Sequence, residues 1–246
     1  MDLPFIYKYQ PLFLQDFEMD DKLLELIQIL IQMDNLNILF VGNSGCGKTS
    51  LITAIIRDYY DNVNYKDNVL YINTLKDQGI SYYRNEVKTF CQTSTNIPGK
   101  KKIIVLDDLD VINEQSQQVF RNFIDKYSHN VHFIASCTNT NKVIESIQSR
   151  MSTTKIKALH TANLSKILKR ICKIENITVE QDAEDFILSI SNNSVRIMIN
   201  YLEKFKLLSS NITLDIAIRV CTNISFRDFE SYTNICKSDK DLQSAI

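Results

Sequence analysis

The chain has 246 residues, of which 44% are hydrophobic and 23% are charged, and its formal net charge is −1. This balance is typical of a globular protein and leaves room for one α/β domain with a smaller companion. The charge balance excludes a generally basic nucleic-acid binder. No apolar run is long enough to span a bilayer, so we expect no membrane span. No basic region precedes an apolar core, so we expect no secretory leader.

Strands and helices are predicted to alternate up to about residue 150. Residues 1–20 read as an extended arm, and Leu23 to Ile31 repeat apolar residues at helical spacing. Short apolar runs predict buried strands at 38–41, 69–72, 103–106 and 131–137. Helices are expected at 50–60, 81–91 and 114–127. This alternation is typical of βαβ units and a parallel sheet flanked by helices, which places the chain in the α/β class.

The pattern changes near Arg150, and from Ala162 onward only helical spacing is found. Helices are expected over 164–174, 183–191 and 195–208, which form a small all-helical domain. Residues 214–246 predict one helix, a turn near Asn223 and the start of another helix. Six scattered cysteines without a CxxC pair predict buried free thiols in a reducing compartment rather than a metal site. The histidines, His129, His132 and His160, are expected to be ordinary surface or edge residues.

Residues 42–49 read G-N-S-G-C-G-K-T and match the phosphate-binding pattern G-x-x-x-x-G-K-[ST]. Three of the five glycines of the chain lie here, where the backbone must curl around phosphate with its N–H groups inward. A chance glycine-rich turn is the weaker alternative, because a strand precedes the loop and a helix follows it. We expect Lys48 to reach the β- and γ-phosphates of ATP and the Thr49 hydroxyl to bind Mg²⁺. The predicted nucleotide-binding residues of this loop are Gly42, Asn43, Ser44, Gly45, Cys46, Gly47, Lys48, Thr49 and Ser50.

The strand over 103–106 ends in two carboxylates, Asp107 and Asp108. In P-loop NTPases the first acidic residue at this position holds Mg²⁺, often through water, and the next one orients the attacking water. A solvated turn is the alternative, since turns favour Asp. With a phosphate loop upstream, we expect Asp107 to bind Mg²⁺ with Thr49, and Asp108 to be catalytic.

These motifs, with others along nearly the whole chain, resemble the small subunits of replication factor C, the AAA+ clamp loader of eukaryotes and archaea. Residues 4–11 resemble the opening P-W-x-x-K-Y-R-P of that family, residues 107–110 stand where it has D-E-A-D, and residues 144–150 match I-E-P-I-Q-S-R. Further similar stretches are 73–80, 83–88, 137–138, 195–196 and 220–223.

The resemblance implies roles for several residues outside the two motifs. Arg150 would be an arginine finger that acts in trans on the ATP of a neighbouring subunit. Thr138 would occupy the sensor-1 position, and Arg196 would sense the γ-phosphate in cis. For both arginines a plain surface position is the alternative. The residues that would border the adenine are Tyr7, Tyr9 and Pro11.

DNA contacts are implied on one helix face, where Arg84 and Lys88 are spaced i and i+4. This face would meet duplex phosphates without sequence specificity, and Arg121 would face DNA as well or couple DNA to Asp108. A solvated helix face is the alternative. Residues 92–98 fall where the family touches the sliding clamp, and they lack aromatic anchors, so we expect a weak clamp contact at most.

The resemblance implies an AAA+ P-loop NTPase domain over residues 1–155, a helical lid domain over 156–210 and a truncated collar start over 211–246. The implied activity is ATP- and Mg²⁺-dependent loading of a sliding clamp onto primed double-stranded DNA, in a hetero-oligomeric ring with other clamp loader subunits and without a membrane. The expected location is intracellular, in the nucleus or at the DNA replication site, or in a virus factory for a viral source.

Asp108 departs from the family, which has Glu at this position. The carboxylate is one methylene shorter and would hold a water less well. Two alternatives therefore stay open. One is a weakly hydrolysing structural subunit that mainly binds ATP. The other is a different AAA+ ATPase of DNA replication or repair, such as an initiator, although we find no room for the usual winged helix after residue 210.

Overall fold

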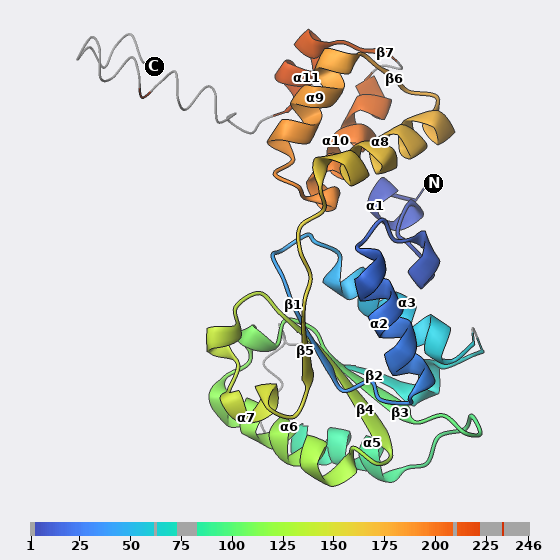
Figure 1. Cartoon of the computed structure of the whole chain (residues 1–246), viewed down its shortest axis with the longest axis vertical. Helices are drawn as coiled ribbons and strands as arrows, with labels where there is room; N and C mark the ends of the chain where they lie inside the picture. The colour runs from blue at the N-terminus through green and yellow to red at the C-terminus, as the bar shows by residue number, and fades with distance from the viewer. Residues whose placement is uncertain (1–2, 62, 73–82, 209–210, 222–232, 234–246) are drawn as a thin grey trace. The chain divides into compact units, whose positions relative to one another are not determined.

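The computed structural model describes residues 3–61, 63–72, 83–208, 211–221 and 233 (Figure 1). The chain forms two compact units. The sheet unit comprises Gln10–Ala158, and the helical unit comprises Met1–Tyr9 together with Leu159–Ile246.

Five parallel strands form the sheet, in the order β2-β3-β4-β1-β5. Their bounds are β1 Ile38–Val41, β2 Val69–Ile72, β3 Lys102–Leu106, β4 Val131–Cys137 and β5 Ser152–Lys155. Every side chain of β3 and β4 is buried, as expected for central strands of a parallel sheet. The predictions of β1 to β4 are confirmed. We missed β5, because its sequence S-T-T-K is polar and gives no hydrophobic signal.

Helices cover both faces of the sheet (Figure 1). The main helices are α2 Asp21–Gln32, α3 Lys48–Tyr59, α5 Lys88–Gln92, α6 Glu114–Tyr127 and α7 Glu145–Gln148. Shorter turns are η1 Leu14–Asp16, η2 Lys66–Asn68, the π-helix η3 Tyr83–Val87, η4 Leu109–Val111 and η5 Thr140–Lys142. Successive strand residues pack against opposite faces: Phe40 joins the core under α2 and α3, whereas Leu39 joins the core with α5, α6 and α7.

The helical unit consists of α1 Phe5–Lys8, α8 Thr161–Glu175, α9 Gln181–Ile190, α10 Val195–Leu208 and α11 Leu214–Val220, with a small parallel pair of β6 Thr178–Val179 and β7 Asn211–Ile212. The predicted helices of this region are confirmed, and α11 begins where expected, but we did not expect the strand pair of β6 and β7. Residues 222–246, apart from 233, lie outside the described residues, and so does the motif at 73–80. None of the described helices combines the length and apolar character that a bilayer span requires.

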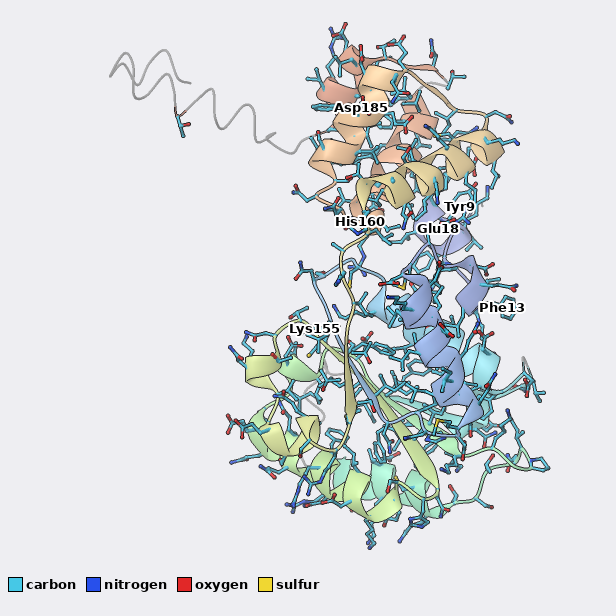
Figure 2. All side chains as sticks on the ribbon, viewed as in Figure 1. Tyr9, Phe13, Glu18, Lys155, His160 and Asp185 are labelled. Atoms are coloured by element: carbon cyan, nitrogen blue, oxygen red, sulfur yellow. The ribbon has the colours of Figure 1, made fainter. Side chains whose placement is uncertain are left out.

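The prediction of an extended arm over residues 1–20 is wrong at Phe5–Lys8, which form α1. Phe5 is buried in the core of the helical unit. Nearby, the buried carboxylate of Glu175 accepts hydrogen bonds from Lys8 Nζ at 2.5 Å and from the Tyr9 hydroxyl (Tyr9 is labelled in Figure 2). Burial of one aromatic ring and this shared carboxylate therefore hold the start of the chain on the helical unit.

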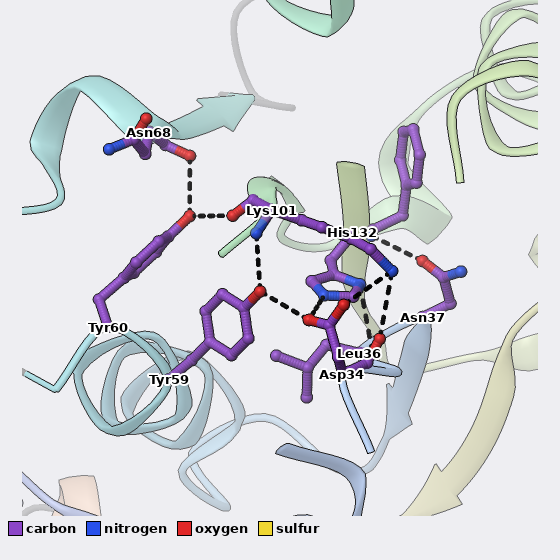
Figure 3. Close-up of polar contacts among 9 residues, drawn as sticks. Asp34, Leu36, Asn37, Tyr59, Tyr60, Asn68, Lys101 and His132 are labelled. Atoms are coloured by element: carbon purple, nitrogen blue, oxygen red, sulfur yellow. Dashed lines mark hydrogen bonds and ion pairs between the residues drawn. The ribbon is translucent and has the colours of Figure 1, made fainter. Parts of the chain in front are cut away.

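A polar network closes the amino-terminal end of the sheet (Figure 3). Asp34 Oδ1 lies 2.9 Å from His132 Nε2 and accepts from the Tyr59 hydroxyl at 2.7 Å, while Lys101 Nζ lies 3.0 Å from Asp34 Oδ2. Burial works against the charged form of Asp34, but the hydrogen bonds from Tyr59, His132 and Lys101 outweigh it and lower its pKa to about 2.

His132 is buried in β4, so its prediction as a surface or edge residue is wrong. By contrast, His160 is exposed at the start of α8 (Figure 2). The Leu36 amide donates to His132 Nδ1 at 3.4 Å, so the proton of the neutral ring lies on Nε2 and points to Asp34. Burial lowers the pKa of His132 below its ordinary value of 6.5, although Asp34 acts in the opposite direction.

We predict that the free energy of unfolding decreases as the pH falls from about 6.5. The folded state keeps His132 neutral while the unfolded state takes up a proton, so the slope from this one residue is at most about 1.4 kcal/mol per pH unit. Urea denaturation at several pH values should therefore give a shallower slope for His132→Gln than for the wild type. The exposed His129→Gln is the control and should keep the wild-type slope. Equal slopes for all three proteins would contradict the assignment.

Candidate functional site

The loop over 42–47 joins β1 to α3 and leaves no space for side chains at its start. A Cβ on Gly42 would lie 2.7 Å from the backbone oxygen of Ile156 and 2.9 Å from Cys46 Sγ. The Gly42 amide donates to the Cys137 carbonyl at 3.2 Å, which ties the loop to the end of β4. Gly47 caps α3 with a φ of 93°, a left-handed conformation that glycine adopts without strain.

Lys48 is the first residue of α3, and its side chain is buried within the loop. The ammonium donates to the carbonyls of Gly42 at 2.7 Å and Asn43 at 3.1 Å. Both acceptors are neutral. A buried cation whose acceptors among the described residues are neutral carbonyls is a favourable neighbour for an anion, so the loop is suited to phosphate.

Asp107 links three elements of the sheet unit. Its Oδ2 accepts from the Thr49 hydroxyl of α3 at 2.7 Å, and its Oδ1 accepts from the Ser136 hydroxyl of β4 at 2.5 Å. The two predicted Mg²⁺ ligands, Thr49 and Asp107, are thus in direct contact. Sequence reasoning missed Ser136. The available signal was a serine inside an apolar strand, since a buried hydroxyl requires a partner.

Asp108 has a φ of 55° and a ψ of 51°, which is unusual for a residue other than glycine. Its amide donates to Ser136 Oγ at 3.1 Å. The same serine therefore fixes the carboxylate of Asp107 and the backbone of Asp108. Such a conformation at the end of a central strand is typical of functional turns.

Residues 38–158 match the family model described as ATPase family associated with various cellular activities (AAA). The replication factor C small subunit of Methanococcus vannielii is 29% identical over 245 residues, which cover 99% of this chain and 78% of the relative. The chain is a relative of the replication factor C small subunits and carries an AAA ATPase domain.

Two further relatives come from other sources. A putative replication factor C small subunit of Acanthamoeba polyphaga mimivirus is 28% identical over 251 residues, which cover 99% of this chain and 78% of that protein. Replication factor C subunit 4 of Saccharomyces cerevisiae is 30% identical over 205 residues, which cover 82% of this chain and 63% of that protein.

The solved structure of the Thermotoga maritima RuvB Holliday junction branch migration motor has a similar fold. Its TM-score is 0.70 at 14% identity, with 93% of this chain and 80% of that chain covered. The predicted α/β fold class with a parallel sheet and flanking helices is confirmed.

Thr138 follows β4 in the AAA domain and is held by Asp110. The Asp110 carboxylate accepts from Thr138 Oγ1 at 2.5 Å, from the Thr138 amide at 3.0 Å and from the Asn139 amide at 3.0 Å. Burial opposes ionisation of Asp110, but these hydrogen bonds outweigh it and lower its pKa below the usual value. The turn after β3 is therefore tied to the loop after β4.

Gln117 on α6 is fully buried and makes a second link between these segments. Its amide nitrogen donates to the carbonyls of Ile112 and Lys142, both at 2.9 Å, and its oxygen accepts from the Ile144 amide at 2.9 Å. Sequence reasoning gave no role to Gln117 or Asp110, because their partners after β4 lie 25 to 29 positions further along the chain.

The structure groups some of the remaining predicted residues and separates others. Arg150 follows α7 and lies beside Asp125 and Arg121 of α6. Arg84 is exposed in η3 and Lys88 is exposed in α5. Tyr7, Tyr9 and Arg196 belong to the helical unit, and Pro11 belongs to the sheet unit, so the adenine border and the γ-phosphate sensor stay predictions.

We predict that Gly42→Ala destabilises the fold by about 1–3 kcal/mol, because the new Cβ overlaps the backbone oxygen of Ile156, which belongs to the segment directly after β5. Gly99→Ala is the matched control. Gly99 also has a positive φ of 73°, but a Cβ there meets nothing within 4 Å. That change should cost only the conformational strain, about 1 kcal/mol. Urea denaturation of both variants measures the difference, and a Gly42→Ala protein no less stable than Gly99→Ala would contradict the packing.

Proposed function

We propose that the chain is an ATP-dependent clamp loader subunit that binds ATP and Mg²⁺, works in a hetero-oligomeric ring and helps load a sliding clamp onto primed double-stranded DNA. The observation that carries the proposal is the Thr49–Asp107 hydrogen bond of 2.7 Å beside a loop with an inward-facing Lys48. The names of the related replication factor C subunits support the clamp loader role.

The residues at this site fit a triphosphate and a magnesium ion. Gly42 leaves no volume for a side chain, and Lys48 has only neutral carbonyl partners among the described residues. Thr49 and Asp107 supply a hydroxyl and a carboxylate oxygen, which are the hard ligands that Mg²⁺ prefers. When bound, the ion would neutralise charge on the phosphate oxygens.

Thr138 and Asp108 would act on the attacking water. A hydroxyl has one hydrogen to donate, and Thr138 gives it to Asp110. Its lone pairs remain to accept a hydrogen bond from a water, which leaves the lone pairs of the water oxygen directed away from Thr138. Asp108 would take the proton as general base. Ser136 would keep Asp108 in place through its backbone amide.

Other residues of the chain would complete the site or recruit partners. Arg150 would stabilise charge on the ATP of a neighbouring subunit, and Arg196 would sense the γ-phosphate in cis. Tyr7, Tyr9 and Pro11 would border the adenine. The exposed Arg84 and Lys88 would meet DNA phosphates, with Arg121 as a further contact. Residues 92–98 would touch the clamp weakly, and the chain would act where DNA is replicated.

A weakly hydrolysing subunit that uses ATP mainly for assembly is the second candidate. Its supporting observation is Asp108, whose carboxylate is one methylene shorter than the Glu of the family. In the left-handed conformation of this residue, Asp is tolerated better than a longer side chain.

We predict that Lys48→Ala weakens ATP binding by about 100-fold or more, because the main cation of the loop is lost. Isothermal titration calorimetry on the folded chain measures the affinity. The exposed Lys66→Ala, in η2 of the same unit, is the control and should bind as the wild type. Unchanged ATP affinity in Lys48→Ala would contradict the proposed nucleotide site.

We predict that Asp108→Asn lowers single-turnover hydrolysis by about 100-fold while ATP affinity stays within about twofold, because the general base is lost and the phosphate contacts are not. The companion variant Asp108→Glu decides between the two candidates. A large gain in hydrolysis would favour the weakly hydrolysing subunit. An Asp108→Asn protein that hydrolyses ATP like the wild type would rule out Asp108 as the base.

A further inference from the structure

The guanidinium of Arg150 is held by groups of its own unit. Its Nε donates to Asp125 Oδ1 at 2.5 Å, and its Nη1 donates to the Ser146 carbonyl at 2.7 Å, with the Ser149 hydroxyl at 3.4 Å. A guanidinium has five N–H donors, of which two are on Nη2. Among the described residues Nη2 has no hydrogen-bond partner, so this amino group is the part of Arg150 that can bind another molecule.

Asp125 makes its close contact with Arg150, although the positively charged Arg121 is nearer to it in sequence. Arg121 lies one turn earlier on α6, at the i,i+4 spacing that favours an ion pair. Its Nε is 3.5 Å from Asp125 Oδ2, is buried and lacks a hydrogen-bond acceptor among the described residues. The carboxylate is thus oriented by Arg150, which is the largest cause that lowers the pKa of Asp125 and keeps it charged.

The charges of this cluster still favour an anion. Arg121 and Arg150 contribute two positive charges and Asp125 one negative charge, so the three side chains together carry +1. Asp125 can hold Arg150 while the cluster still attracts phosphate, because the positive charge of Arg121 compensates the negative charge of Asp125.

We propose that Asp125 is a positioning residue that fixes Arg150 with its Nη2 group free for the nucleotide of a neighbouring subunit. A free arginine side chain loses rotamer entropy when it is immobilised. In this arrangement much of that loss occurs on folding, before a phosphate is bound. The inference rests on the proposed function, in which Arg150 acts in trans.

The test measures ATP hydrolysis by the complex that copurifies with a tag on the full chain. Arg150→Ala should lower kcat by about 1,000-fold, as expected for an arginine finger. We expect Asp125→Asn to lower kcat by about 10-fold and Asp125→Ala by more, with KM for ATP within about twofold, since neither residue would hold ATP in its own subunit. Glu114→Gln changes an exposed carboxylate in the first turn of the same helix and should leave both constants unchanged.

A double variant separates positioning from a general structural role. If Asp125 acts through Arg150, then Asp125→Asn combined with Arg150→Ala should be no slower than Arg150→Ala alone. An additional loss in the double variant, or a melting temperature of Asp125→Asn lowered by more than about 4 °C, would overturn the positioning role. Full hydrolysis by Asp125→Asn, beside an inactive Arg150→Ala, would overturn this inference and leave the proposed function intact. Full hydrolysis by Arg150→Ala would overturn the trans role of Arg150 and the inference with it.

Discussion

The carboxylate of Asp107 accepts one hydrogen bond from α3 and one from β4, and the geometry of the site depends on this shared acceptor. The sheet register makes the sharing possible. Leu106 pairs with Ala135 and Val41 pairs with Cys137, so the carboxyl ends of β3, β4 and β1 lie at one edge. Because Asp107, Ser136 and Thr49 come from three separate elements, a shift of any one of these elements would break the contact. The packed core on both faces of the sheet keeps them in register.

Two polar residues extend this constraint away from the loop. Asp110 holds the backbone of Thr138 and Asn139, and buried Gln117 joins the turn after β3 to the segment before α7. Since α7 ends just before Arg150, these two residues connect the segments between the end of β3 and the residue that we propose to act on a neighbouring subunit. The contacts of Gln117 are buried or partly buried, whereas those of Asp110 are exposed.

Sequence reasoning succeeded where a pattern is local. The apolar runs of β1, β3 and β4 and the glycine spacing of the loop can be recognised in the sequence without knowledge of distant contacts. It failed for β5, whose four polar residues are specified only by pairing with β1. It also failed for His132, because a histidine in a strand gives no indication that Asp34, nearly one hundred positions away, will pair with it.

The candidate site residues divide in the same way. Lys48, Thr49 and Asp107 are predicted because they belong to short motifs. Ser136 and Asp125 were not predicted, since each contacts a residue that is remote in sequence. Arg84 and Lys88 are predicted to act on another molecule, and within this chain they are simply exposed.

The burial of Phe5 in the helical unit determines which fragments of the chain can fold on their own. The unit is discontinuous in sequence, since its core needs a ring from the first ten residues as well as helices beyond residue 160. A recombinant piece that starts at Leu159 would lack that ring and expose the apolar surface it covers. A piece that is meant to fold as the helical unit therefore has to retain the first residues of the chain.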